Sequence, residues 1–569
     1  MGFGLLVSYI DEAPCRLKSS PGEDLGRSMN PRDRARPATV TTAQNFDQNS
    51  VDASHLLRYV FFASASVIET PNQRPFSMDT PNSLAPPATQ PLYQRLAAYY
   101  RTAIQTGSLV PGDRMPSLRA LMRLHDTSLS TALQLSRQLE SEGWLEARPR
   151  SGYFVQRPLR STLASVAEPR MDVIPDPAQF VGIHARVSDF VARGRLQPVK
   201  INLSVARCAP DLYPAHALAQ AAVRVLRRHP RLLVTASSPR GHPEFRAALA
   251  KRALGLGLTL SPDDLQITNG CIEALNLALR AVAQPGDTIA VESPTFYGLL
   301  QVLESLGLQA LEIPTSPQTG ISIDALELAM QTYASIKAVV VVPYLQNPLG
   351  SIMPDSHKQR LVQLCEEHAV ALIEDDCYSE LVNERTRANT PLRAMKSWDT
   401  TGNVIYCASL HKILAPGLRL GWIAAGRWQA RVEMLKYVQT RSNERLSQLA
   451  VADFMASPAF DRHLRRLRSA LQTQRDKSAE LIARYFPPGT RLNVPDGGLA
   501  LWVELPQKLS SKRVFDAALQ EQILVAPGLM FSNSLRFDAY LRINCGWPHS
   551  PEVAQAFQRL GHSVGQLLD

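Results

Sequence analysis

Residues 409–422 read SLHKILAPGLRLGW and place one lysine, Lys412, between two apolar segments that we expect to be strands. Ser409 lies three residues before this lysine, and Arg419 lies seven residues after it. An amine held in a partly desolvated site has a lowered pKa and condenses readily with an aldehyde to form a Schiff base. Ser409 and Arg419 would then hold a phosphate group. Because most lysines are solvated surface groups, Lys412 indicates a binding site only in combination with other segments of the sequence.

Two further segments carry groups that suit an aromatic, phosphorylated ligand. Residues 373–378 read IEDDCY, which puts Asp375 at the end of an apolar strand, where a carboxylate needs a partner. Asp375 would pair with a protonated pyridine nitrogen, and Tyr378 would reach an oxygen of the same ring. Residues 268–279 read TNGCIEALNLAL, in which Gly270 turns a strand into a helix. The first N–H groups of that helix form an anion site.

Asn347 and Phe296 complete the candidate set. Asn347 follows an apolar strand in YLQNPLG (344–350), at the carboxyl edge where ligands bind in open α/β sheets. Phe296, in SPTFYG (293–298), would stack on a flat ring. Each feature alone has an ordinary explanation, such as an acidic strand end or an aromatic core residue. Their joint order along the chain is what indicates a binding site.

The chain after Lys200 alternates helices with apolar strands. We expect strands at 288–292, 337–343, 370–375, 404–409 and 418–424, and helices at 271–282, 297–306 and 357–368. Such alternation predicts an α/β fold in which a mostly parallel sheet has helices on both faces.

Residues 200–569 resemble the fold-type I pyridoxal-phosphate enzymes of the aminotransferase family, with a smaller C-terminal α/β subdomain. The segments PDGGLALW (495–502) and VAPGLMF (525–531) match that family as well. The resemblance implies pyridoxal 5'-phosphate as the cofactor and Lys412 as the catalytic lysine that carries it. It also implies that Asp375 pairs with the pyridine nitrogen, that Tyr378 and Asn347 contact the ring oxygen, that Phe296 stacks on the ring, and that Cys271, Ile272, Ser409 and Arg419 surround the phosphate.

The same resemblance implies an effector or substrate site at Arg542. In LRINCGW (541–547), Arg542 stands where these enzymes bind the substrate carboxylate by a bidentate pair. The sequence departs from the family in ASSPRGHPEFR (236–246), because Ala236 stands where a tyrosine often reaches the phosphate of the partner subunit. Phosphate binding across a dimer would then be weaker or use other groups.

A second unit is expected at residues 89–157. Apolar spacing predicts helices at about 92–104, 117–124 and 128–142, followed by a two-stranded hairpin within 144–155. Helix, helix, helix and hairpin is the order of a winged helix-turn-helix. Between residues 78 and 160 there are ten arginines, no lysine and six acidic residues. This basic excess fits binding to phosphates, although a solvated basic domain with a structural role is the plainer alternative.

Residues 92–155 closely resemble the GntR family of winged-helix regulators. They contain the segment G-x-L-x-P-G-x-x-x-P-S-x-R and the step E-x-E-G-W-L into the wing. The resemblance implies binding to double-stranded operator DNA, with the N-terminal end of the third helix in the major groove. The expected DNA-binding residues are Arg119, Ser128, Ser130, Thr131, Arg148 and Gly152. Leu129 and Leu133 depart from the family, since many GntR proteins carry base-reading arginines there.

The remaining segments and the composition predict an extension, a linker and the cellular compartment. Residues 1–88 are expected to be a disordered extension, with Met78 as a possible translation start, and the proline-containing residues 158–199 are expected to be a linker. The 569 residues carry a net charge of +10 and seven cysteines without CxxC spacing, so no metal site is expected. The odd cysteine count and the absence of a secretion signal favour the cytoplasm.

The order of the two units resembles the MocR regulators, which include PdxR-like and GabR-like proteins. The resemblance implies a homodimeric transcription regulator whose cofactor domain senses an amino compound or a vitamer. Two alternatives stay open. One is an active aminotransferase with an appended DNA-binding domain, and the other is a DNA-binding protein whose cofactor domain is an inactive dimerisation scaffold.

Overall fold

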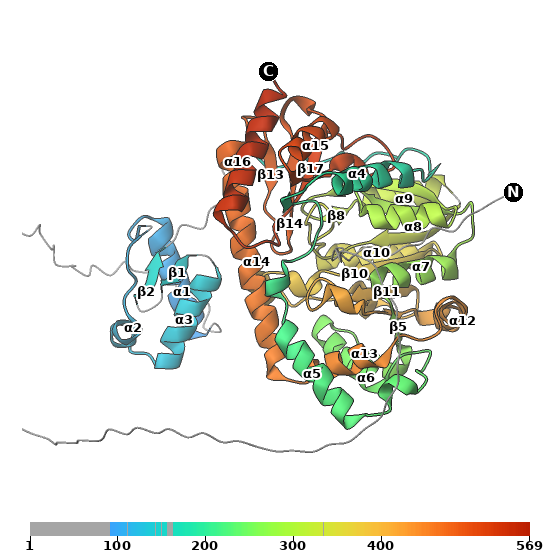
Figure 1. Cartoon of the computed structure of the whole chain (residues 1–569), viewed down its shortest axis with the longest axis horizontal. Helices are drawn as coiled ribbons and strands as arrows, with labels where there is room; N and C mark the ends of the chain where they lie inside the picture. Colours follow the sequence, from blue (N-terminus) through green and yellow to red (C-terminus); the bar gives the residue numbers. More distant parts are fainter. Residues whose placement is uncertain (1–90, 111, 143, 149–150, 156–162, 334) are drawn as a thin grey trace, which may run out of the picture. The chain divides into compact units, whose positions relative to one another are not determined.

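The computed structural model describes residues 91–110, 112–142, 144–148, 151–155, 163–333 and 335–569. The expected extension at 1–88 and the possible start at Met78 lie outside these residues. Within 91–155 the chain forms three helices and a hairpin (Figure 1). Their bounds are α1 (Leu92–Gln105), α2 (Leu118–Leu124), α3 (Leu129–Ser141), β1 (Leu145–Arg148) and β2 (Gly152–Val155).

Side-chain caps fix the starts of the second and third helices of this domain. The Ser117 side chain accepts a hydrogen bond from the backbone N–H of Ala120 at the start of α2. The Ser128 side chain accepts one from the N–H of Thr131 at the start of α3. Both serines satisfy a backbone donor that the helix itself cannot, which stabilises each start by about 1 kcal/mol.

A small apolar core and one ion pair hold these helices together. Ala97, Leu121 and Leu135 are buried in this core, one from each helix. Arg101 of α1 donates to both carboxylate oxygens of Glu142, which follows α3, at 2.6–2.9 Å. This fork joins the first helix to the end of the third. The expected order of a winged helix-turn-helix is therefore present.

The hairpin forms the wing. β1 pairs antiparallel with β2, with Arg148 opposite Gly152. Gly152 has φ +99, a left-handed conformation that glycine adopts without strain. A bridge between Arg114 and Phe154 adds a third short segment to the wing.

The large domain is built on a nine-stranded sheet. Its strand order is β3-β7-β6-β9-β10-β11-β12-β5, with β8 paired to β7. The five central strands run parallel, whereas β12 is antiparallel to both β11 and β5. The strands are β3 (Gln179–Phe180), β5 (Gln266–Thr268), β6 (Thr288–Ser293), β7 (Gln309–Ser316), β8 (Gly320–Ile321), β9 (Ile336–Val341), β10 (Ala371–Asp376), β11 (Val404–Ser409) and β12 (Gly421–Ala424).

Helices cover both faces of this sheet. In β9, Ala338 and Val340 belong to the core that α7 and α8 cover, whereas Val339 and Val341 belong to the core that α9 and α10 cover. This alternation shows that both faces of the strand are buried. The helices around the sheet are α5 (Ala215–Arg228), α6 (Pro243–Ala253), α7 (Cys271–Val282), α8 (Tyr297–Ser305), α9 (Ile323–Thr332), α10 (Asp355–Glu367), α11 (Glu384–Asn389), α12 (Gln429–Gln439) and α13 (Arg445–Met455).

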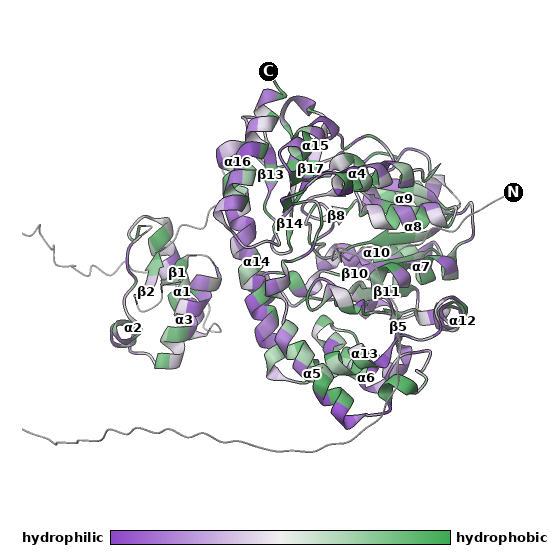
Figure 2. Cartoon of the chain, in the orientation of Figure 1, coloured by the Kyte–Doolittle hydropathy of each residue, from purple (hydrophilic) through white to green (hydrophobic). Residues whose placement is uncertain are grey.

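A smaller subdomain completes the chain. Its antiparallel sheet has the order β13-β14-β17-β16, and β15 pairs in parallel with β4. The long helix α14 carries both hydrophilic and hydrophobic residues along its length (Figure 2). The elements are β4 (Ile201–Asn202), α14 (Pro458–Tyr485), β13 (Arg491–Asn493), β14 (Ala500–Glu504), α15 (Ser511–Gln520), β15 (Ile523–Leu524), β16 (Ala526–Pro527), β17 (Tyr540–Asn544) and α16 (Pro551–Gln566). The expected α/β fold class is confirmed.

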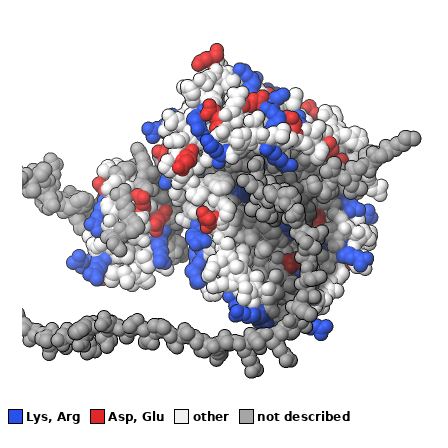
Figure 3. Space-filling model, viewed as in Figure 1, with Lys and Arg blue, Asp and Glu red and all other residues white. Residues whose placement is uncertain are grey.

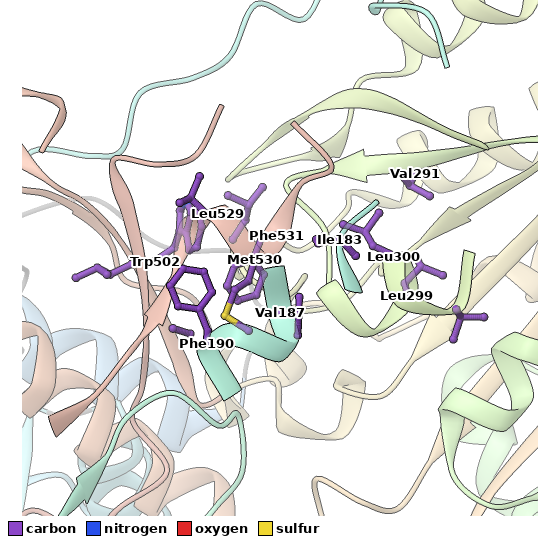
Figure 4. Close-up of a cluster of buried hydrophobic side chains, with 14 of the residues drawn as sticks. Ile183, Val187, Phe190, Val291, Leu299, Leu300, Trp502, Leu529, Met530 and Phe531 are labelled. Atoms are coloured by element: carbon purple, nitrogen blue, oxygen red, sulfur yellow. The ribbon is translucent and has the colours of Figure 1, made fainter. Parts of the chain in front are cut away.

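The expected linker at 158–199 needs correction. Residues 156–162 lie outside the described part, but the chain from Leu163 onward packs on the large domain. Ala164 bridges Arg491, and β3 pairs with β7. The helix α4 (His184–Leu196) buries Val187 and Phe190 among side chains of the small subdomain and α8 (Figure 4). Apolar residues at helical spacing outweigh the prolines here, so these residues belong to the domain.

No helix within the described residues is long and apolar enough to cross a membrane.

The start of β12 is a point where the backbone is too close for a side chain. A Cβ atom added to Gly421 would lie 2.6 Å from the backbone carbon of Gly270 and 2.8 Å from the carbonyl oxygen of Ala408. We expect Gly421→Ala to lower the free energy of unfolding by about 1–3 kcal/mol, because two strands must move apart. Denaturant unfolding measures the effect. Gly417→Ala is the matched control, since nothing lies within 4 Å of the added atom, and equal stability of the two variants would contradict the close approach.

Candidate functional site

Lys412 lies just beyond the carboxyl end of β11, in the loop between β11 and β12. Its Nζ donates a hydrogen bond to the carbonyl oxygen of Ala206 at 2.5 Å and lies 5.8 Å from the centre of the Tyr378 ring. Burial lowers the pKa of the Lys412 amine to about 8 because the charged form is desolvated. Lys412 therefore has a far larger neutral, nucleophilic fraction at neutral pH than a surface lysine.

Asp375 lies buried at the end of β10, the strand next to β11. The thiol of Cys271, the first residue of α7, donates to its Oδ1 at 3.1 Å. Burial raises the pKa of Asp375, and hydrogen bonds from the Cys377 and Cys271 thiols act in the opposite direction. The carboxylate is thus a buried acceptor at the strand edge, close enough to Lys412 to affect the pKa of that amine.

A hydrogen-bonded row of three side chains joins this edge to the small subdomain. The Asn347 amide donates to the Tyr378 hydroxyl at 3.4 Å, and Arg542 of β17 donates to the Asn347 carbonyl oxygen at 3.1 Å. Burial raises the pKa of Tyr378 above its ordinary value, so this hydroxyl stays protonated. Arg542 is 1% exposed and also donates to the carbonyl oxygen of Ser204. Its guanidinium lies 4.8 Å from the centre of the Phe531 ring.

The segment before α7 and the loop after Lys412 meet at a corner that has the donors expected of an anion site, called here the anion-binding corner. Gly270, with φ +79, turns the chain so that the first N–H groups of α7 are free of helical partners. Arg419 donates to the carbonyl oxygen of Asn269 at 3.1 Å, and its guanidinium approaches Gly270. Ser409 lies beside Cys377, with 3.4 Å between Oγ and Sγ. These donors suit a phosphate group.

A buried ion pair between α7 and α12 holds the turn that forms this corner. Glu273 of α7 accepts hydrogen bonds from the backbone N–H of Asn269 at 2.5 Å and from the Thr440 hydroxyl at 2.7 Å. The fully buried ammonium of Lys436 in α12 lies 3.0 Å from the same carboxylate. The pair ties the turn before α7 to α12.

The structure therefore brings most of the expected site residues together. Seven of them lie at the carboxyl edge of the large sheet, and Arg542 reaches this edge from β17 of the small subdomain. The seven are Lys412, Asp375, Tyr378, Asn347, Cys271, Ser409 and Arg419. Ile272 is the second residue of α7 and is 38% exposed. Phe296 lies at the start of α8, where its ring lies over Gly298 and 5.0 Å from the Tyr297 ring.

Sequence reasoning missed several members of this site. Tyr297 lies 5.8 Å from the Arg542 guanidinium, and the cysteine at 377 lies within 4.8 Å of both Cys271 and Asp375. Two thiols and a carboxylate at this spacing have the arrangement of metal ligands, which CxxC spacing along the chain does not reveal. The Glu273 and Lys436 pair was missed as well, because 163 residues separate its members.

The recognition surface of the winged helix-turn-helix is placed only in part. Arg119, Ser128 and Ser130 are exposed, and Gly152 is exposed in the wing. The Ser128 hydroxyl lies 2.8 Å from that of Ser130 and 2.9 Å from that of Thr131, so the three form one cluster at the start of α3. The backbone of Arg148 ends β1, and its side chain lies outside the described part. Basic side chains also lie on the visible face of this domain (Figure 3).

Two family models match the chain. One describes bacterial regulatory proteins of the gntR family and matches residues 92–155. The other describes aminotransferases of class I and II and matches residues 198–560. Fold and sequence thus define a DNA-binding protein with an aminotransferase-type domain.

Relatives share this arrangement over nearly their whole length. The HTH-type transcriptional regulator YdcR of Escherichia coli K12, itself uncharacterized, is 38% identical over 84% of this chain and 99% of its own. YjiR of the same organism is 35% identical over the same shares. The probable rhizopine catabolism regulatory protein MocR of Rhizobium meliloti is 27% identical over 77% of this chain and 87% of its own. This chain belongs to the MocR-type family of HTH transcriptional regulators, in which a GntR-type domain precedes an aminotransferase-like domain.

Solved structures resemble the large domain. A kynurenine aminotransferase from Pyrococcus horikoshii superposes with a TM-score of 0.62 at 26% identity, over 68% of this chain and 95% of its own. The α-aminoadipate aminotransferase LysN of Thermus thermophilus gives a TM-score of 0.60 at 25% identity, over 67% of this chain and 97% of its own.

The buried pair beneath the anion-binding corner can be tested by removing one charge. Lys436→Met leaves the Glu273 carboxylate buried without its cation, and we expect the free energy of unfolding to fall by about 3–5 kcal/mol. In the double variant Lys436→Met/Glu273→Gln no charge of the pair remains and the amide group still offers hydrogen bonds to Asn269 and Thr440, so most of the loss should be recovered. Denaturant unfolding of the three proteins measures this. A double variant as unstable as the single one would show that the pair does not act through charge.

Proposed function

We propose that the aminotransferase-type domain of this regulator carries pyridoxal 5'-phosphate on Lys412 and senses a small amine or amino acid. Binding of that effector changes the affinity of the chain for operator DNA. The observation that carries the proposal is the buried Arg542, which lies close enough to the Lys412 amine to lower its pKa. A carboxylate receptor beside a reactive amine suits recognition of an amino acid.

The residues at the sheet edge fit this cofactor. A phosphate would find the start of α7, Ser409 and Arg419; a pyridine nitrogen would find Asp375; and a ring oxygen would find Tyr378 and Asn347. When bound, pyridoxal phosphate supplies an aldehyde that reacts with amines and a ring that withdraws electrons. Similar structures support this choice, because the kynurenine aminotransferase was solved with PMP and LysN with N-(5'-phosphopyridoxyl)-L-leucine.

Each side chain has a defined task in this site. Lys412 offers a neutral amine because its ammonium form is desolvated. Asp375 presents a carboxylate that the Cys271 thiol orients by its hydrogen bond. The Tyr378 hydroxyl accepts from Asn347 and stays protonated, so it would donate its own proton to a ligand oxygen. These groups lie on or directly after neighbouring strands, which would hold the site in place before a ligand binds.

Arg542 would bind the carboxylate of the effector. Its Nε has no hydrogen-bond partner among the residues that the structure describes, which leaves a buried donor for a ligand oxygen. An effector shifts a conformational equilibrium only if it binds the two states with different affinity. An arginine that also holds Asn347 and Ser204 would transmit such a difference, because a bound carboxylate competes for the same donors.

An active aminotransferase is a second candidate function. The observation that favours it is the retention of Lys412, Asp375 and Arg542 together, since a scaffold for dimerisation alone requires none of them. Sustained amino transfer over many turnovers would support this second function, whereas a single exchange of the amino group would support a sensor.

A homodimer is the proposed assembly. Met434, Tyr437 and Val438 form an apolar row on α12 and are each at least 50% exposed in the single chain. Arg240, in the segment that contains Ala236, donates to Glu433 of α12 at 2.9 Å. An exposed apolar row of this kind favours contact with a second copy of the chain.

The lowered pKa of Lys412 predicts how cofactor attachment depends on pH. Only the neutral amine attacks an aldehyde, so the attachment rate should rise about fivefold from pH 7 to pH 8 and level off above pH 9. Visible absorption, followed after pyridoxal phosphate is mixed with cofactor-free protein, measures the rate.

Two lysine variants control this measurement. Lys412→Ala should give no visible band from covalent attachment, whereas Lys251→Ala, which alters an exposed lysine, should behave like the wild type. A rate that keeps rising towards pH 10 would contradict a desolvated amine at position 412.

Arg542 provides the test of the sensing function. In the wild type, amino acids are screened for a shift of the cofactor absorption band, and each hit is then titrated into a DNA mobility-shift assay. Arg542→Ala should keep the cofactor band. The effector concentration that gives the half-maximal response should rise at least about tenfold, because a charged hydrogen bond contributes about 1.5–3 kcal/mol. Arg542→Lys keeps the positive charge but loses the bidentate geometry of the guanidinium, so effector binding should be weakened in this variant as well. Unchanged titrations in both variants would exclude this arginine from the effector site.

A further inference from the structure

The outward face of α3 carries two leucines that the domain core does not use. Leu129, the first residue of the helix, is 54% exposed, and Leu133 lies one turn later in the same row and is half-buried. The core face of α3 is formed instead by Ala132, Leu135 and Leu139. Single exposed leucines are common on protein surfaces. Leu129, however, lies at the end of the helix that enters the major groove in a winged helix-turn-helix.

The hydroxyl groups beside Leu129 already take part in hydrogen bonds within the protein. Ser128 accepts the backbone N–H of Thr131 and also contacts the hydroxyls of Ser130 and Thr131. One hydroxyl has one donor and two acceptor positions, so these three contacts use the full capacity of Ser128. Ser128 therefore caps the helix, and the most exposed large side chain in the first turn is an apolar one.

The charged surroundings of this row fit DNA. Arg137 lies two turns after Leu129 in the same row and is exposed, and Arg119 and Arg123 are exposed on the preceding helix. These arginines supply phosphate contacts, which position a protein on the duplex without selecting a sequence. Selection then depends on the side chains that face the bases, and the first-turn leucine is the largest of them.

In the major groove, the thymine methyl is the apolar group that a leucine side chain can contact. We propose that Leu129, supported by Leu133, contacts thymine methyl groups, so that the start of α3 selects an A·T base pair in each half-site. Gln134, exposed and directly after Leu133 in α3, suits the adenine edge, which offers a donor and an acceptor to an amide. The inference rests on the DNA-binding function of this domain and adds the bases that it reads.

Replacing thymine by uracil tests this contact, because it removes one methyl group and leaves base pairing intact. Duplexes are first selected from a random library with the full-length, cofactor-loaded protein. Each thymine of a selected duplex is then replaced singly by uracil, and binding is measured by fluorescence anisotropy. We expect at least one uracil per half-site to weaken wild-type binding about fourfold, which corresponds to about 0.8 kcal/mol for one buried methyl group.

Three variants assign the effect to Leu129. Leu129→Ala should bind the thymine and uracil duplexes with equal affinity at the sensitive position. Leu124→Ala is the matched control, because Leu124 is equally exposed, at 56%, but ends α2; it should retain the full uracil effect. Leu129→Arg, selected against the same library, should shift the preferred base at that position to guanine, which arginine reads by two hydrogen bonds.

The possible outcomes distinguish a failure of the thymine contact from a failure of specific DNA binding. If no sequence is enriched and binding follows only salt concentration, the chain lacks specific operator recognition and both statements fail. If a sequence is enriched but no uracil substitution weakens binding, or if Leu129→Ala keeps the uracil effect, only the thymine contact is overturned.

Discussion

The buried carboxylate of Asp375 sets the conditions for the whole sheet edge. A carboxylate without water is costly unless donors and positive charge compensate it. The chain supplies them from two other elements, the Cys271 thiol at the start of α7 and the Lys412 amine from the loop after β11, and from the Cys377 thiol directly after β10. The start of α7 and the loop after β11 therefore converge on the end of β10.

This convergence is accompanied by a close backbone contact between the start of β12 and the turn before α7. Gly421 begins β12 where it contacts the backbone of Gly270, and this contact brings the turn before α7 against the loop that carries Arg419. The Glu273 and Lys436 pair then holds the same turn from below. The position of the anion-binding corner is thus a consequence of strand packing.

The two domains of the chain use different physical means to bind their ligands. The large domain buries its reactive groups, which shifts their pKa values and prepares them before a ligand arrives. In the winged helix, several of the candidate DNA-binding residues are exposed, among them Arg119, Ser128 and Ser130. A fixed chemical site suits recognition of a small molecule, whereas an exposed helix suits the wide groove of a duplex.

The sequence by itself determined the fold class and the order of the two family segments, and it predicted site residues that the structure brings close together. It could do so because buried strands read as apolar runs, and the polar residues that end them, such as Asp375 and Asn347, stand out against that background. The caps at Ser117 and Ser128 are equally local, since each acts on a backbone group three residues away.

Only the tertiary structure decided which of these residues touch. The contact between Cys271 and Asp375 spans 104 residues, that between Lys436 and Glu273 spans 163, and that between Arg542 and Asn347 spans 195. The assignment of β3 and α4 to the large domain, where a linker was expected, was decided in the same way. Local periodicity gives the type of each element, but the order of strands and the partner of each buried charge follow from packing over the whole domain, which no local pattern contains.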